Sequence, residues 1–233
     1  MVDRISSGTS IIDSMLRGGY EKDCITTIFG PAGAGKTTLC ILAAIETAKQ
    51  GKKVIYVDTE GGFSLERFAQ LSSDDTGILN KLIFLRPSSF SDQQKDFEKL
   101  RDLTKSQVGL IIIDTIAMLY RLQLGSTQDV STTNRELGRQ MAFLTEISRK
   151  KEIPVLITNQ MYSFFDDREK THMVGGDVMQ YGSKCIIELQ IAPNRNRRVI
   201  LRKHRSIPEL LEVMFEIKNF GLVEIKPNKF KLF

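Results

Sequence analysis

Short runs of consecutive apolar residues alternate, over the first two-thirds of the chain, with segments whose apolar residues have helical spacing. A continuous apolar run is typical of a strand that is buried on both faces of a parallel sheet. These runs predict strands at 24–29, 53–58, 81–86, 109–114 and 153–159. The segments around them predict helices at 10–17, 36–50, 64–71, 91–106 and 133–151.

The first predicted helix carries its own boundary signals. Ser10 and Asp13 have the spacing of a capping box, and Gly18 and Gly19 follow as a helix stop. We therefore expect the Ser10 hydroxyl and the Asp13 carboxylate to cap the first turn of this helix.

The pattern changes after Gln160. Residues 161–182 are rich in Gly, Asp and aromatic residues and have no clear period, which predicts a long loop of functional use. Strands are predicted again at 184–193 and 197–205 about a short turn, and a second pair lies within 212–225. The fold class expected is α/β: a mainly parallel sheet flanked by helices, with antiparallel C-terminal strands, in one domain over residues 1–233.

Composition favours a cytoplasmic protein. The chain has 233 residues, 41% of them hydrophobic and 26% charged, without a run long and apolar enough for a membrane span. The N-terminus lacks the plan of a secretory signal, and Cys24 and Cys40 are expected to be buried, reduced thiols.

Basic residues concentrate near the C-terminus. The formal net charge is +5, and residues 194–205 contain six Lys or Arg and no acid. This segment could bind a polyanion, or it could be a solvated basic edge strand that discourages aggregation. If the segment binds a polyanion, the residues expected to contact it are Arg195, Arg197, Arg198 and Arg202.

A nucleotide phosphate site is predicted at the loop between the strand at 24–29 and the helix at 36–50. Gly30, Gly35, Lys36 and Thr37 fit the G-x-x-x-x-G-K-[ST] pattern in its strand–loop–helix setting. Backbone N–H groups of this loop would face the phosphates, and Lys36 would reach the terminal ones. The expected phosphate-contacting residues are Gly30, Pro31, Ala32, Gly33, Ala34, Gly35, Lys36, Thr37 and Thr38.

Polar residues at other strand ends extend this site. Asp114 ends an apolar strand, where its carboxylate could hold Mg²⁺ together with the Thr37 hydroxyl. Asp58 and Glu60 lie at the end of the strand at 53–58, the strand that follows the phosphate-loop helix. One could polarise an attacking water while the other is a structural acceptor, and position favours Glu60 as the base. Gln160 ends the last parallel strand, where its amide could bond the γ-phosphate and link nucleotide state to the following loop.

Two other nucleotide-dependent classes fit less well. A GTPase would read guanine through an N-K-x-D segment, which "TNQM" does not supply. A small-metabolite kinase would carry an arginine-rich lid, and the basic segment here lies within predicted strands.

Taken in order, "GPAGAGKTTL", "VIYVDTEGGFSLERF", "LIIIDTIAMLYR", "RELGRQM" and "VLITNQM" resemble the ATPase core of the RecA/Rad51/RadA recombinases. The segments "VGGDVMQYGSK" and "IPELLEVMFEI" extend the resemblance over nearly the whole chain. It is most similar to the short archaeal paralogues of that family, because only about 30 residues precede the phosphate loop. We therefore expect neither the N-terminal helical DNA-binding domain nor the linker segment that docks on a neighbouring subunit.

The resemblance implies ATP and Mg²⁺ as cofactors and assigns roles by position. Glu60 would be the water-activating carboxylate, Gln160 the γ-phosphate sensor and Arg67 an arginine that stacks on adenine. Arg135 and Arg139 would face DNA near the first DNA loop of the family, and residues 161–182 would be the second DNA loop.

One departure changes the expected activity. Residues 161–182 hold four acidic and two basic residues, and an acidic loop opposes a strong DNA filament. We therefore expect a weakly hydrolysing accessory protein of homologous recombination and DNA repair, which binds DNA and assists the main RadA-type recombinase without strand exchange of its own.

A junction-processing nuclease is a further partner that the resemblance implies. We expect at most a weak or small homo-oligomer, and no association with a membrane. Two alternatives stay open: a filament-forming, DNA-dependent recombinase ATPase, and a KaiC-like signalling ATPase that does not bind DNA.

Overall fold

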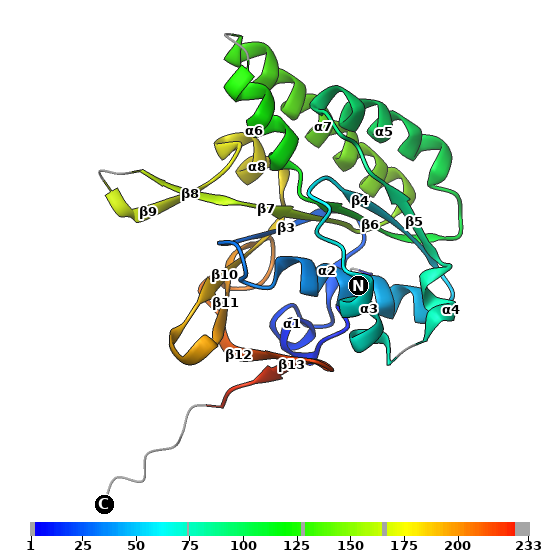
Figure 1. Ribbon diagram of the computed structural model, residues 1–233, viewed down its shortest axis with the longest axis vertical. Helices are drawn as coiled ribbons and strands as arrows, with labels where there is room; N and C mark the ends of the chain where they lie inside the picture. Colours follow the sequence, from blue (N-terminus) through cyan, green and yellow to red (C-terminus); the bar gives the residue numbers. More distant parts are fainter. Residues whose placement is uncertain (1–2, 74, 127–128, 165–166, 227–233) are drawn as a thin grey trace, which may run out of the picture.

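The computed structural model describes residues 3–73, 75–126, 129–164 and 167–226, with the backbone alone at 76, 162–164 and 167–172. Nine strands form the main sheet, in the order β13-β12-β11-β10-β3-β7-β6-β4-β5 (Figure 1). From β10 to β5 all neighbours are parallel, and from β10 to β13 all are antiparallel. The strands span β3 Ile25–Phe29, β4 Lys53–Asp58, β5 Leu82–Leu85, β6 Val108–Asp114, β7 Val155–Asn159, β10 Cys185–Ile191, β11 Arg197–His204, β12 Glu212–Lys218 and β13 Gly221–Glu224.

Helices cover both faces of the parallel strands (Figure 1). One layer holds α1 Ser10–Met15, α2 Lys36–Lys49, α3 Leu65–Ser72 and α4 Thr76–Leu79. The other holds α5 Phe90–Leu103, α6 Ala117–Ser126, α7 Val130–Lys151 and α8 Gly176–Gly182. A short 3-10 turn, Pro193–Arg195, joins β10 to β11.

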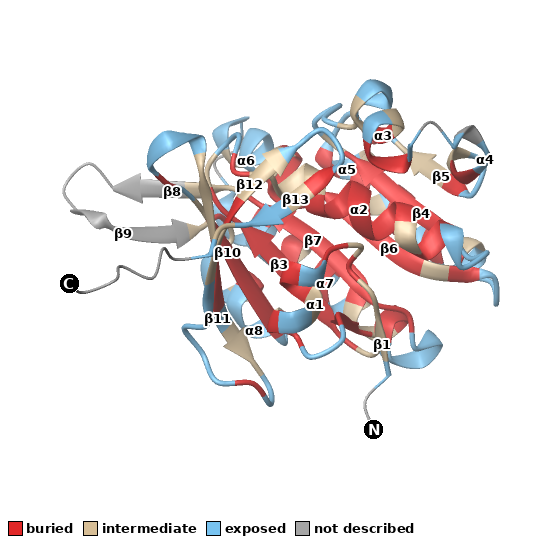
Figure 2. Ribbon diagram, turned by 90° about the horizontal axis from the view of Figure 1, so that it is seen from below, coloured by how far each residue is buried: buried red, intermediate tan, exposed pale blue. Residues whose placement is uncertain are grey.

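The core divides at the sheet because side chains of a strand point alternately to its two faces. In β6, Leu110 and Ile112 pack with α2, whereas Ile111 and Ile113 pack with α5 and α7. Figure 2 shows the buried residues concentrated on the parallel strands and on α2. The expected α/β class, with a mainly parallel sheet and antiparallel C-terminal strands, is thereby confirmed.

The prediction of a long loop over residues 161–182 is wrong. The backbone pairs β8 Met161–Phe164 with β9 Asp167–Met173 as an antiparallel hairpin, and α8 follows. The hairpin projects beyond the parallel strands (Figure 1). An alternating apolar pattern arises where one face of a strand must be buried, so a projecting hairpin need not show one.

The capping box predicted at the first helix is also wrong. Thr9 is the N-cap residue, and no side chain caps the helix. The Asp13 carboxylate instead accepts hydrogen bonds from the Ser7 backbone N–H (2.7 Å) and the Ser6 hydroxyl (2.6 Å). Asp13 therefore organises the loop that precedes the helix, between β1 Arg4–Ile5 and α1; β1 itself pairs with β2 Tyr20–Glu21.

The expectation of buried, reduced thiols is confirmed. Cys24 and Cys40 are buried and free, as is Cys185. No helix in the described part of the chain is long and apolar enough to cross a membrane.

Candidate functional site

The predicted nucleotide residues meet where the parallel strands end. The register pairs Phe29 with Asn159 and Asp58 with Asp114, so the segments after β3, β4, β6 and β7 start side by side. Together they enclose a cavity of about 310 Å³. It is lined by Ala32, Gly33, Gly35, Lys36, Thr37, Thr38, Glu60, Asp114, Thr115, Thr158, Gln160 and Ile217.

Backbone packing determines the shape of the phosphate loop. A Cβ at Gly30 would lie 2.3 Å from the Leu189 carbonyl oxygen, so the loop leaves β3 in direct contact with β10. Gly35 has φ 105°, a left-handed conformation that glycine adopts without strain, and α2 begins at the next residue. The loop thereby turns sharply enough to present its amides and the helix N-terminus to one point.

Lys36 bridges the loop from inside. Its ammonium group donates to the carbonyl oxygens of Gly30 (2.8 Å) and Pro31 (2.9 Å). Burial lowers the pKa of Lys36, while the negative charges of Asp114 and Glu60 act in the opposite direction. The cation is thus held in the cavity, where a phosphate oxygen could replace the two carbonyls. Of the predicted loop residues, Gly30, Pro31 and Ala34 do not line the cavity, and Ala34 is buried.

Asp114 lies at the floor of the cavity and is held by two hydroxyl groups. Tyr56 donates to its Oδ2 (2.9 Å) and Thr158 to its Oδ1 (2.5 Å). Asp114 and Thr37 line the same cavity, and a carboxylate with a hydroxyl is the kind of oxygen donor set that Mg²⁺ accepts. The residues present therefore fit a magnesium ion. Sequence reasoning missed Tyr56 and Thr158, which lie inside apolar strands.

The structure separates the two acids after β4. The buried Asp58 carboxylate accepts hydrogen bonds from the backbone N–H groups of Gly62 (3.0 Å) and Phe63 (3.3 Å), so it holds the turn together. Glu60 lines the cavity instead. Desolvation raises the pKa of Glu60, and the Asp114 charge adds to this, whereas the Gln160 hydrogen bond and the Lys36 charge oppose it. The geometry supports Glu60, rather than Asp58, as the base.

Gln160 connects two charged groups. Its Nε2 donates to Glu60 Oε1 (2.6 Å), and its Oε1 accepts from the Arg121 guanidinium (2.7 Å). Arg121 belongs to α6, and sequence reasoning gave it no role. No local pattern could have found it, because its relation to Gln160 depends on how α6 packs beside the end of β7.

Arg67 is fixed away from the phosphate loop. Its guanidinium donates to the backbone oxygens of Lys218 (2.9 Å) and Asn219 (3.2 Å), and to the side chain of Gln70 (3.0 Å). These bonds tie α3 to the turn between β12 and β13. Ile217, next to that turn, lines the cavity, whereas Arg67 itself does not.

The basic segment 194–205 is not one free strip. Arg197 donates to the Gly33 carbonyl oxygen (3.1 Å), and Arg202 forms an ion pair with the buried Glu188. Arg198 pairs with Glu212 at 3.4 Å, leaving Arg195 as an exposed cation on the turn before β11. The alternative of an edge strand is wrong, because β11 pairs with β12 on one side and with β10 on the other.

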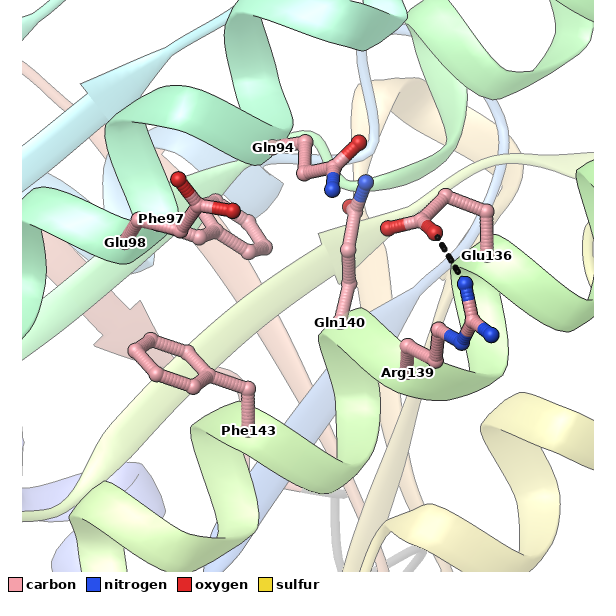
Figure 3. A pocket seen from close by; sticks show the side chains of 7 residues that line it. All are labelled: Gln94, Phe97, Glu98, Glu136, Arg139, Gln140 and Phe143. Carbon is pink, nitrogen blue, oxygen red and sulfur yellow. Dashed lines mark ion pairs between the residues drawn. The ribbon is translucent and has the colours of Figure 1, made fainter.

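The two arginines of α7 lie elsewhere. Arg135 bonds Thr132, and Arg139 pairs with Glu136 at 3.5 Å. Figure 3 shows Arg139 and Glu136 at a second cavity, of about 220 Å³, between α5 and α7. The predicted DNA-facing arginines therefore do not gather at one place.

Comparisons with known proteins agree with this architecture. Residues 1–225 match the Rad51 family. A "DNA repair and recombination protein RadB" of Methanobrevibacter smithii is 41% identical over 219 residues, which cover 91% of this chain and 92% of the relative. The protein of the same name from Methanosphaera stadtmanae is 40% identical over 219 residues, covering 92% and 93%.

A solved structure shows the same fold. The "Crystal structure of the RadB recombinase" superposes with a TM-score of 0.81 at 33% identity, and covers 95% of this chain and 100% of that one. The fold is thus the RecA-like ATPase fold, whose members use nucleotide and magnesium. The chain belongs to the Rad51 family and, within it, groups with the RadB proteins.

Proposed function

We propose that this chain is an ATP- and Mg²⁺-binding accessory protein of homologous recombination and DNA repair, acting as one RecA-like domain. The observation that carries the proposal is the single cavity that collects the phosphate loop, Asp114, Glu60 and Gln160. Membership of the Rad51 family supplies the setting in recombination.

The proposal gives distinct parts to residues that line the cavity and to Arg67, which lies outside its lining. Lys36 and the loop amides bind the phosphates, and Arg67 contacts the adenine. Mg²⁺, when bound by Thr37 and Asp114, supplies charge neutralisation at the phosphates. Glu60 takes a proton from the attacking water, and Gln160 donates to the γ-phosphate.

Hydrolysis is expected to be slow, so that ATP acts as a switch. The Gln160 side chain bonds Glu60, while its backbone oxygen accepts from the Val174 N–H (3.2 Å), across the base of the β8–β9 hairpin. When the bound nucleotide changes, the Gln160 side chain gains or loses its bond to the γ-phosphate. Because the Gln160 backbone lies at the base of the hairpin, this change can alter the hairpin position. The acidic charge of residues 161–182 argues against strand exchange by this chain alone.

The proposed partners are DNA and the main RadA-type recombinase, with a junction-processing nuclease as a further candidate and weak or small homo-oligomers at most. Arg195 and Arg198, on the β10–β11 turn and β11, are the proposed DNA contacts there, and Arg135 and Arg139 of α7 are the others. Arg197 and Arg202 have structural partners and are secondary candidates.

One experiment tests the catalytic part. ATPase activity is measured with and without single-stranded DNA, for the wild type and for Glu60→Gln. We expect slow turnover that Glu60→Gln abolishes while ATP binding persists. Rapid DNA-stimulated turnover with filaments in the electron microscope would instead establish a recombinase.

A second experiment tests DNA binding. The DNA affinity should fall steeply with rising salt, and Arg195→Glu with Arg198→Glu should weaken it uniformly across sequences. Arg149→Glu, on the last turn of α7, is the matched charge-reversal control. Absence of DNA binding at low salt would favour a KaiC-like signalling ATPase.

A further inference from the structure

Three side chains from separate elements form a continuous hydrogen-bonded chain at the rim of the cavity. Arg121 of α6 donates to Gln160 Oε1 at 2.7 Å, and Gln160 Nε2 donates to Glu60 Oε1 at 2.6 Å. Gln160 and Glu60 line the cavity, whereas Arg121 lies outside it and is exposed. The hydrogen-bonded route from Arg121 to the cavity thus runs through Gln160.

The chemistry of the three groups determines which way the amide points. A guanidinium has donors only, so it must face the amide oxygen, and an ionised carboxylate has acceptors only, so it must face the amide nitrogen. The two ends of a glutamine amide have nearly the same shape, and only their hydrogen-bond partners distinguish them. Arg121, from outside the cavity, and Glu60, from its lining, together direct the N–H group of Gln160 into the cavity.

We infer that Arg121 is a positioning residue that gives the site its preference for a triphosphate over a diphosphate. The inference rests on the proposed function, in which Gln160 donates to the γ-phosphate. With Arg121 in place, the amide N–H group faces the cavity before the nucleotide arrives. Without Arg121, Glu60 alone orients the amide. Whenever that hydrogen bond is broken, the amide can turn its oxygen inward, where a lone pair facing an anionic phosphate is repulsive.

The backbone around Gln160 should not depend on Arg121. The Gln160 N–H bonds the Asn159 side chain (2.8 Å), and the Gln160 carbonyl accepts from Val174 (3.2 Å). Asn159 is buried and also donates to the Val174 carbonyl (2.8 Å). Truncating Arg121, which is exposed, should therefore free the Gln160 side chain and leave the main chain in place.

The test compares the affinities for N-methylanthraniloyl-labelled AMPPNP and ADP with Mg²⁺ present. Arg121→Ala should weaken AMPPNP binding by about three- to tenfold, less than the full value of one charge-assisted hydrogen bond because Glu60 still orients the amide, and should leave ADP binding unchanged. Arg121→Lys, which keeps a donor-only cation, should recover much of the preference. Arg149→Ala, on the last turn of α7, is the matched control and should change neither affinity.

A double-mutant comparison shows whether Arg121 acts through Gln160. Arg121→Ala combined with Gln160→Ala should bind AMPPNP no more weakly than Gln160→Ala alone. The inference would be overturned if the losses in AMPPNP affinity of the two single variants added up in the double variant. It would also be overturned if Arg121→Ala lost AMPPNP and ADP affinity equally, or kept the wild-type preference for AMPPNP. Those outcomes leave ATP binding by the wild type intact; a wild type that binds neither nucleotide would refute the proposed function and this role with it.

Discussion

The Arg197 guanidinium, on β11, donates a hydrogen bond to the carbonyl oxygen of Gly33, in the middle of the phosphate loop, at 3.1 Å. The same guanidinium donates to the carbonyl oxygens of Arg195 (2.7 Å) and Asn196 (3.0 Å). One side chain thus ties the turn before β11 to the loop expected to hold the nucleotide. Residues from the antiparallel part of the sheet contribute to the site in this way.

Truncating Arg197 should therefore lower nucleotide affinity. Arg197→Ala removes a bond worth about 1 kcal/mol and leaves the loop less ordered, so the Kd for ADP should rise by roughly fivefold. Titration with labelled ADP measures this, with Arg149→Ala as the control. If ADP binding were unchanged while DNA binding fell, Arg197 would belong to the DNA surface instead.

Substitution at Gly30 should be strongly destabilising. A methyl group there would meet the Leu189 carbonyl oxygen at 2.3 Å, so Gly30→Ala must displace either the phosphate loop or β10. We expect a loss of more than about 2 kcal/mol in the free energy of unfolding, and loss of nucleotide binding.

The matched control is Gly138→Ala, within α7. A Cβ at Gly138 meets nothing within 4 Å, so the substitution should stabilise the protein by up to about 1 kcal/mol through helix propensity. Urea unfolding of the two variants measures both effects. A Gly30→Ala variant as stable as the wild type would show that β10 can move away from the loop.

Substitutions of Asp114 and of its partner Tyr56 should have separable effects, the first on Mg²⁺ binding and the second on stability. Asp114→Asn removes the charge expected to hold Mg²⁺, so added Mg²⁺ should no longer strengthen ATP binding. Tyr56→Phe keeps that charge but loses the 2.9 Å hydrogen bond to Oδ2, which should lower the free energy of unfolding by about 1–3 kcal/mol.

Titrations of ATP with and without Mg²⁺, together with thermal unfolding, distinguish these variants. The Tyr56→Phe variant should retain the Mg²⁺ effect on ATP affinity. Retention of that effect by Asp114→Asn would contradict the assignment of Asp114 to the metal.

The pH dependence of hydrolysis should report on Glu60. Desolvation is the main cause that raises the pKa of Glu60, and unlike the Asp114 charge it persists when Mg²⁺ is bound; a base works only when ionised. Activity should therefore fall, as the pH is lowered, through a value above the ordinary pKa of a glutamic acid. Gln160→Ala removes a hydrogen bond to the ionised carboxylate and should move this fall to higher pH.

The pH profile of the ATPase rate under saturating ATP measures the effect. Arg149→Ala should keep the wild-type profile. A fall of activity at the pH of an ordinary glutamic acid, in the wild type, would place the limiting ionisation on another group.

By itself, the sequence determined the buried framework and the phosphate loop. Strands such as β6 are continuous apolar runs because both of their faces are covered, and that requirement is readable in the residues themselves. The order of the parallel strands then brings their carboxyl ends together, so Lys36, Asp114, Glu60 and Gln160 could be expected in one place.

Only the tertiary structure decided what the polar residues contact. Asp58 and Glu60 lie two positions apart, and hydrogen bonds to a turn, not position, separate their environments. Arg197 looked like part of a basic strip, yet it bonds the phosphate loop, and Arg121 gained a role only through α6. Apolar burial leaves a periodic trace along the chain, whereas a hydrogen bond depends on the distance between residues far apart in sequence, which no local pattern records.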